Sequence, residues 1–153
     1  MGRTVPKPNK NVSSIPKFVP QPKVFRRSDG EGCLRIRMTS MDAGGPWCLL
    51  NVDPEHFIDL LPRLKSLEQM KKKEVFRQGS KLGKVYRVED IPNPDALRRL
   101  MEIDLDDQTE IARLEITGER RLYGFISNDD CPDFWVLWWD PKHAIWPSKL
   151  KHT

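Results

Sequence analysis

The chain has 153 residues, of which 38% are hydrophobic, and this length predicts one domain. No apolar run reaches the roughly 18 residues of a membrane-spanning helix, and none follows the first charges as in a secretory signal, so we expect no membrane partner. The formal net charge is +4, and the three cysteines lie far apart, which indicates reduced thiols and a cytoplasmic location rather than a disulfide framework.

The positive charge is concentrated near the N-terminus. Residues 1–27 hold seven Lys and Arg and no Asp or Glu, whereas the rest of the chain holds 19 Lys and Arg against 22 Asp and Glu. Residues 1–28 also hold five prolines, each of which fixes φ and removes a backbone donor. The sequence therefore predicts a disordered, basic, Pro-rich arm at residues 1–28 and a single α+β domain at residues 29–153.

The first part of the domain combines short apolar runs with one clear helix. Apolar and basic residues alternate over 34–38, which predicts a half-buried strand, and the apolar run 47–52 predicts a second strand. Asp53 suits the cap of a helix whose apolar residues follow at helical spacing. Pro62 lies inside this helix and predicts a kink or two shorter helices. The lysines at 71–73 suit the negative pole at the helix end.

The second part of the domain predicts one more helix and most of a sheet. Residues 94–103 place apolar side chains at helical spacing, and residues 117–119 form a predicted hairpin turn. Gly124 inside a strand predicts a bulge or a close backbone approach. Six consecutive apolar residues at 134–139 indicate a central strand covered on both faces. The predicted strands here are residues 85–88, 112–117, 121–126 and 134–139, with an edge strand at 144–146.

Several common catalytic motifs are absent from the sequence. It contains no P-loop, no G-x-G-x-x-G, no H-E-x-x-H, no paired C-x-x-C and no G-x-S-x-G. Their absence argues against the common nucleotide-binding, zincin and serine-hydrolase chemistries. No pair of cysteines or histidines has the spacing of zinc ligands. We therefore expect no cofactor and no metal.

A block of cationic and aromatic residues near the C-terminus carries the strongest chemical signal. Arg121 and Tyr123 lie two apart on one predicted strand and share a face, where they suit holding a phosphate and stacking a base. His143 follows the next strand and titrates near neutrality, as an acid or base for RNA cleavage must. We predict that these three residues are catalytic. Nucleic-acid contacts are predicted for the basic residues Lys142, Lys149, Lys151, Arg26 and Arg27.

Each candidate catalytic residue also has a purely structural interpretation. Arg121 can pair with Glu115 or Glu119 across the hairpin, and the tyrosine of the block can be a core-edge residue with a hydrated hydroxyl. His143 can close its turn by a hydrogen bond to Asp140. The tryptophans of the block suit a core better than a base-stacking surface.

The segment Arg121–Ser148 resembles a family of small bacterial and phage proteins. The shared pattern is R-x-x-G … F-x-x-L-W-x-D-P-x-H-x-x-x-P-S, and its D-P-x-H turn is the most specific element. The upstream segment Trp47–Met70 is also similar to members of that group. The predicted order of elements, helices followed by three antiparallel strands, resembles the RelE/ParE toxin superfamily.

The resemblance implies helices packed on a C-terminal antiparallel sheet and a metal-independent endoribonuclease that cleaves mRNA on the ribosome. It implies RNA or the ribosome and an antitoxin protein as partners, and by position it implies Arg121, Tyr123 and His143 as the active residues. The match is partial, because this domain is slightly acidic whereas such toxins are usually basic. The alternative hypothesis is a non-catalytic binding module that engages nucleic acid or a protein through the basic arm.

Overall fold

The computed structural model describes residue 2, residues 32–127 and residues 132–148. Of the predicted arm at residues 1–28 only Gly2 falls within these ranges, so the disorder of the arm stays a prediction. Arg26, Arg27, Lys149 and Lys151 also lie outside the described residues.

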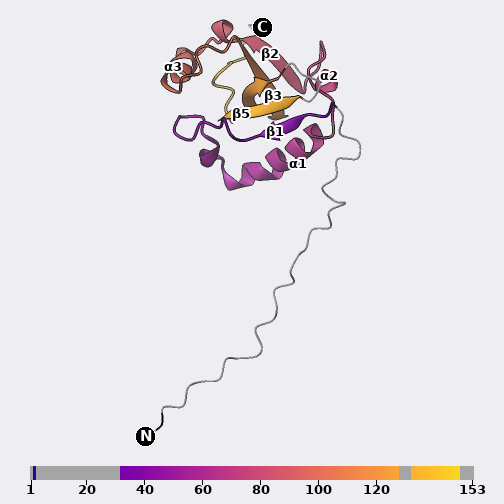
Figure 1. Ribbon diagram of the computed structural model, residues 1–153, viewed down its shortest axis with the longest axis vertical. Helices are drawn as coiled ribbons and strands as arrows, with labels where there is room; N and C mark the ends of the chain where they lie inside the picture. Colours follow the sequence, from indigo (N-terminus) through magenta and orange to yellow (C-terminus); the bar gives the residue numbers. More distant parts are fainter. Residues whose placement is uncertain (1, 3–31, 128–131, 149–153) are drawn as a thin grey trace, which may run out of the picture.

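A five-stranded sheet forms the middle of the domain (Figure 1). Its strands are β1 (Arg35–Arg37), β2 (Gly83–Arg87), β3 (Glu110–Thr117), β4 (Arg120–Ile126) and β5 (Asp133–Asp140). They lie in the order β1-β5-β4-β3-β2, with β1 parallel to β5 and the other neighbours antiparallel. The predicted α+β class with an antiparallel C-terminal sheet is confirmed. The parallel edge formed by β1 is additional, because alternation shows that a segment is a strand but not which strand it pairs with.

Helices cover both faces of the sheet. The elements are α1 (Phe57–Leu67), α2 (Lys72–Val75), α3 (Pro94–Glu102) and the single 3-10 turns η2 (Leu49–Asn51), η3 (Pro54–His56) and η4 (Val88–Asp90). α1 and α2 pack on one face and α3 on the other (Figure 1). α3 is confirmed as predicted, because Asn93 caps it by accepting the N–H of Asp95 at 2.9 Å. Within the described ranges, no helix is both long and apolar enough to cross a bilayer.

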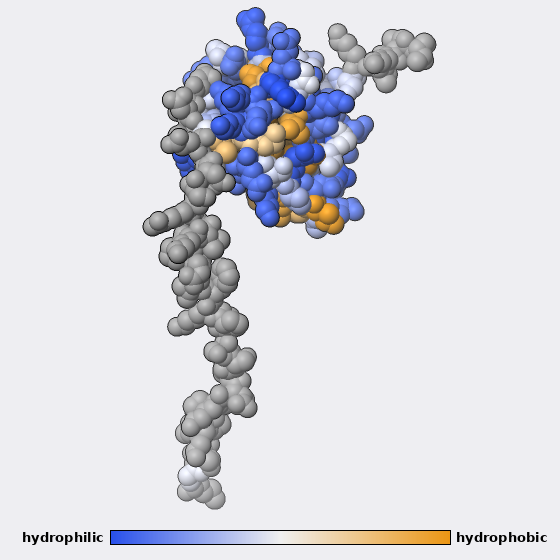
Figure 2. Space-filling model, turned by 90° about the vertical axis from the view of Figure 1, so that its right-hand side faces the viewer, coloured by the Kyte–Doolittle hydropathy of each residue, from blue (hydrophilic) through white to orange (hydrophobic). Residues whose placement is uncertain are grey.

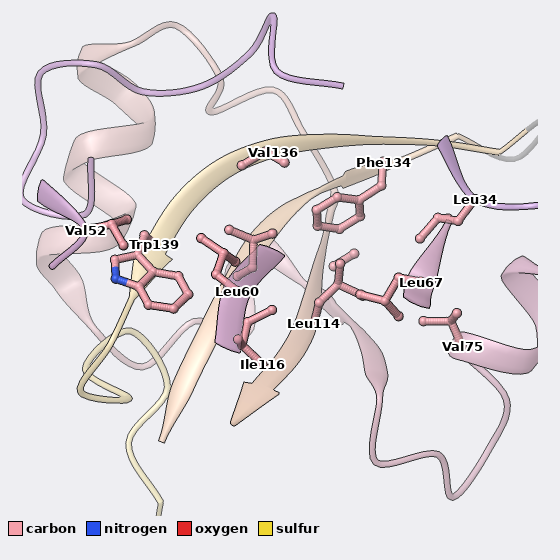
Figure 3. Packing of buried hydrophobic residues seen from close by; sticks show 12 residues of the cluster. Leu34, Val52, Leu60, Leu67, Val75, Leu114, Ile116, Phe134, Val136 and Trp139 are labelled. Carbon is pink, nitrogen blue, oxygen red and sulfur yellow. The ribbon is translucent and has the colours of Figure 1, made fainter. Parts of the chain in front are cut away.

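The larger core lies between α1, α2 and the sheet. Leu60 and Leu67 lie seven residues apart on α1 and both point into this core, as Figure 3 shows. Val75 joins them from α2, and Trp139 packs in the same core from β5. Full burial of each such side chain contributes roughly 1.5–3 kcal/mol. The remaining buried members are Leu34, Val52, Ala112, Leu114, Ile116, Leu122, Phe134 and Val136.

A second core lies between α3 and the opposite face of the sheet. Leu100 of α3 packs there with Tyr123, Leu137 and Trp138. Register pairs Gly124 with Val136 and Tyr123 with Trp138, so Leu137 is an extra residue in β5. This bulge lets two successive residues of β5 face the same core. The prediction that residues 134–139 are covered on both faces is thereby confirmed.

Gly124 makes the close backbone approach that its place in the sequence predicts. A Cβ at this position would lie 2.1 Å from the carbonyl oxygen of Trp135, and the register of β4 and β5 shifts between Tyr123 and Gly124. A residue without a side chain is therefore required at the bulge.

Two predicted strands are wrong. Residues 47–52 instead contain the single turn η2, whose N-cap Cys48 accepts the N–H of Leu50 on its Sγ at 3.3 Å. A short apolar run suits a buried turn as well as a strand, and here its tryptophan packs on Trp138 with ring centroids 5.3 Å apart. Residues 144–146 are not a strand, because Asp140 already binds the amides of residues 144 and 145.

Pro62 interrupts α1 less than predicted. The helix runs unbroken from Phe57 to Leu67 with Pro62 inside it. Pro62 and Ile58 both lie on the exposed side of α1, so the carbonyl of Ile58 that loses its helical donor faces water. Solvation of that carbonyl removes the reason for a break.

A buried carboxylate joins three parts of the second core. Asp42 accepts Nε and Nη2 of Arg99 at 2.8 and 2.7 Å and Nε1 of Trp138 at 3.0 Å. The backbone amides of Gly44 and Gly45 donate to the same side chain at 3.1 and 3.2 Å. Hydrogen bonding from Arg99 is the main reason that the pKa of Asp42 lies well below its usual value.

Candidate functional site

Arg121 and Tyr123 lie on β4 and face the second core. Tyr123 is fully buried, and Arg121 keeps only 9% of its surface exposed. Arg113 of β3 is the register partner of Tyr123 and is also 9% exposed. Tyr86 of β2 packs on the same side. We call these four residues, Arg113, Arg121, Tyr86 and Tyr123, the arginine–tyrosine face.

Arg113 is a buried cation with few contacts that replace the lost hydration of its guanidinium. Its guanidinium carbon lies 5.3 Å from the ring centroid of Tyr86, a cation–π contact. Its Nε is buried and has no hydrogen-bond partner in residues 32–127 and 132–148. No ion pair joins it to a carboxylate of the described chain. A buried guanidinium of this kind is open to a further anionic partner.

Arg121 is bound mainly to its own hairpin. Its Nη1 donates to the carbonyl oxygens of Gly118 and, at 3.0 Å, of Arg120. Its Nη2 lies 3.8 Å from Oε2 of Glu115, so the predicted pairing across the hairpin exists but is long. The Nε of Arg121 is buried without a partner among the described residues. The guanidinium is therefore held in place but only partly satisfied.

The two tyrosines connect the arginines electrostatically. Burial raises the pKa of Tyr123 and the charge of Asp140 adds to the rise, whereas Arg113 opposes it through its charge and a hydrogen-bonding contact. Burial also raises the pKa of Tyr86, and both arginines oppose it. The Tyr123 hydroxyl is buried beside Arg113, and no well-aligned hydrogen bond satisfies it in the part of the chain that the structure describes. Both phenols therefore stay protonated at neutral pH.

Trp146 covers one side of the arginine–tyrosine face. Its ring stacks on Tyr86 with centroids 4.1 Å apart and an interplanar angle of 26°. Trp138 and Trp139 are buried in the two cores, as predicted, whereas Trp135 and Trp146 are partly exposed. Access to Arg113 from this side thus depends on where Trp146 lies.

His143 lies in the turn after β5, in the left-handed region with φ 56°. The prediction that its side chain closes this turn is wrong. Asp140 instead accepts the backbone amides of Lys142, Ala144 and Ile145 at 3.3, 2.9 and 2.8 Å. The Nδ1 of His143 is buried without a partner among the described residues.

The structure brings the predicted site residues together only in part. Arg121 and Tyr123 share one face, but no hydrogen bond or ion pair within the described ranges joins either of them to His143. Lys142 is exposed on the turn beside it. The geometry therefore suits the binding of an anion at the arginine–tyrosine face better than a proton transfer among Arg121, Tyr123 and His143.

Arg113, Tyr86 and Trp146 are members of the site that motif reasoning does not single out. Alternation in residues 112–117 places Arg113 on the polar side of its strand, which predicts a solvated residue. Its burial follows from the pairing with Tyr123 and from the cover that Tyr86 provides. Neither contact leaves a signal in the local sequence.

No group of three His, Cys, Asp or Glu side chains that would hold a metal ion occurs in the ranges that the structure describes. Compared with known proteins, the chain matches no family model, no curated protein and no solved structure.

Proposed function

We propose that this is an RNA-directed protein of the RelE/ParE type, in which the arginine–tyrosine face receives a phosphate of the RNA backbone. The observation that carries the proposal is Arg113. It is nine-tenths buried, has no ion pair in the described chain, and lies on the same face as Arg121. Two partly satisfied guanidiniums on one face suit the spread charge of a phosphate.

The electrostatics of this face support an anionic ligand. Removing a guanidinium from water is costly unless a counter-charge or several hydrogen bonds replace the lost solvation. Here the nearest ion-pair partner of either arginine in the described residues is Glu115, at 3.8 Å from Arg121. A phosphate would supply acceptors to the unpartnered Nε groups of both arginines.

The order of the elements supports the RelE/ParE comparison. α1 and α2 precede the antiparallel strands β3, β4 and β5, which is the arrangement on which the resemblance rests. Cleavage would further require the Tyr86–Trp146 stack to open, because Tyr123 has no exposed surface in the closed arrangement. An antitoxin protein would then be the expected protein partner.

A second candidate function is a non-catalytic binding module. The observation that favours it is the burial of the Tyr123 hydroxyl together with the lack of any hydrogen bond from the arginine–tyrosine face to His143 in the described chain. On this hypothesis the face binds RNA but performs no proton transfer.

RNA binding and cleavage by matched arginine variants test the proposal. Arg113→Gln is expected to weaken the binding of single-stranded RNA by at least about tenfold, because a charge-assisted hydrogen bond contributes about 1.5–3 kcal/mol. Arg98→Gln is the control, since that arginine is exposed and its one ion pair in the described residues is with Asp95 on its own helix. Affinity would be measured by fluorescence anisotropy at one fixed salt concentration.

One further variant and a folding check make the result interpretable. Arg113→Lys keeps the charge but not the fork of donors, so an intermediate affinity is expected. Thermal melting checks that each variant is folded. Wild-type protein that cleaves RNA, alone or with ribosomes, supports the toxin hypothesis, and binding without cleavage supports the second candidate. Equal RNA affinity of folded Arg113→Gln and Arg98→Gln would overturn both uses of this face.

A further inference from the structure

An open hollow of about 560 Å³ lies beside α2, on the opposite side of the sheet from the arginine–tyrosine face. A backbone bridge between Cys33 and Lys71 and a hydrogen bond from Leu34 N to the carbonyl of Met70, at 2.9 Å, hold its walls together. Figure 2 looks onto the side where α2 lies in Figure 1 and shows a mostly hydrophilic surface with apolar atoms between the polar groups. We call this space the α2 hollow.

Basic side chains line the α2 hollow. Lys71, Lys73 and Arg77 all border it and are exposed. No ion pair holds any of these three within residues 32–127 and 132–148. Lys72 also borders the hollow but donates its Nζ to the carbonyl of Ser127 at 2.7 Å. Among the described residues, no ion pair keeps these three cations from meeting an anion.

The acidic residue of the same segment does not neutralise this charge. Glu74 directs its Oε2 to the backbone N–H of Lys71 at 2.7 Å and so starts the short helix. Glu74 borders a separate hollow together with Met70 and Gly79, and it does not line the α2 hollow. The lysines at 71–73 lie at the start of α2 and not at the end of α1, so the predicted role at the negative pole of a helix end is wrong.

An aromatic ring completes the α2 hollow. Phe76 lines it and is half-buried, and Pro132 also borders it. The Phe76 ring is fixed by close packing, because a Cβ on Gly83 would lie 2.7 Å from its Cε1 atom. A fixed, partly exposed ring bordered by cations suits a flat, anionic ligand.

We infer that the α2 hollow binds one nucleotide, with the base against Phe76 and the phosphate against Lys73 and Arg77. The volume lies within the range of about 300–1,000 Å³ that small-molecule sites occupy. Any of the bases can stack on an aromatic ring, and basic residues beside the ring bind the phosphates of the nucleic-acid backbone. The nucleotide must be unpaired, because a base in a duplex has no free face.

This inference does not depend on the arginine–tyrosine face. The α2 hollow adjoins the first core through Val75, whereas Arg113 and Arg121 lie on the side of the second core. Variants of one site leave the other intact, so the two proposals fail separately.

The test is a pair of double variants in the full chain. Lys73→Ala with Arg77→Ala is expected to weaken binding of a short single-stranded RNA by about tenfold. It is also expected to lower the salt slope by about 0.7, since one phosphate loses its cationic partners. Lys65→Ala with Arg98→Ala removes the same charges from exposed positions elsewhere and is expected to leave affinity within about twofold. Equal affinity of the two double variants would overturn the inference.

A base-specific readout separates stacking from general charge attraction. A 4-thiouridine in the RNA is expected to crosslink, under long-wave ultraviolet light, to the tryptic peptide Glu74–Arg77, which contains Phe76. Phe76→Leu, which keeps an apolar side chain, is expected to reduce affinity about fivefold or more. If AMP displaces the RNA, the natural ligand is a free nucleotide. If an oligonucleotide displaces the RNA but AMP does not, the ligand is a nucleotide within a strand. Equal binding of duplex RNA, or equal competition by poly-glutamate, would contradict a nucleotide site.

Discussion

Replacing Asp42 with Asn is expected to lower the free energy of unfolding by about 3 kcal/mol. The carboxylate is 6% exposed and accepts five hydrogen bonds, two of them from Arg99. The amide cannot accept all of these bonds or balance the guanidinium. Arg99 keeps some access to water. The expected loss in free energy of unfolding is therefore at the lower end of the range for breaking a buried ion pair. Urea denaturation measures the difference.

The same variant changes the dependence of stability on pH. The pKa of Asp42 is lower in the folded protein than its ordinary value of 3.8, chiefly through hydrogen bonding from Arg99. Its contribution is therefore complete above that value and is lost as the pH falls further toward the folded-state pKa. Asp42→Asn is expected to remove this part of the acid sensitivity. Asp95→Asn, in an exposed pair, is the control and should cost less than about 1 kcal/mol. Similar losses in both variants would contradict the role of Asp42.

Replacing Asp140 with Ala is expected to cost about 3 kcal/mol and to loosen the chain that carries Trp146. The carboxylate is fully buried and accepts three backbone amides, those of Lys142, Ala144 and Ile145. Each amide left without an acceptor costs about 1–3 kcal/mol if it stays buried, and part of this is recovered as water enters. Urea denaturation gives the total, and hydrogen exchange of the amides at 142–146 shows where it arises.

Asp107→Ala provides the comparison for Asp140→Ala. Asp107 is exposed and bonds only to the side chain of its neighbour Gln108 among the described residues, so its loss should lie within about 0.5 kcal/mol. Faster exchange at residues 142–146 in Asp140→Ala, but not in Asp107→Ala, is the expected pattern. Unchanged exchange in both would show that the carboxylate does not hold the turn.

Local sequence signals predict most of the elements of this fold. Apolar residues at helical spacing mark α3, alternation marks β1 and β3, and Gly124 marks the bulge, because each of these features depends on neighbouring residues. The parallel pairing of β1 with β5 joins segments about a hundred residues apart, and no local pattern encodes it. The run 47–52 is not a strand, because its apolar residues form a 3-10 turn whose tryptophan packs on Trp138.

The candidate site is predicted less well than the fold. Arg121 and Tyr123 are found by their spacing on one strand, but the burial of Tyr123 depends on α3 and on Trp146, which come from other parts of the chain. Arg113 is not predicted as a site residue, because the alternation of its strand predicts that it is solvated. The partnerless Nε of Arg113 is visible only when the strands are paired and the face is covered.

The most direct measurement follows the Nε–H resonance of Arg113 by NMR during titration with single-stranded RNA. In the free protein this group is buried and has no acceptor among the described residues. If the arginine–tyrosine face receives a phosphate, the resonance shifts and exchanges more slowly with water as RNA saturates the protein, while that of exposed Arg98 stays unchanged. An unchanged Arg113 resonance at full RNA saturation would contradict the account.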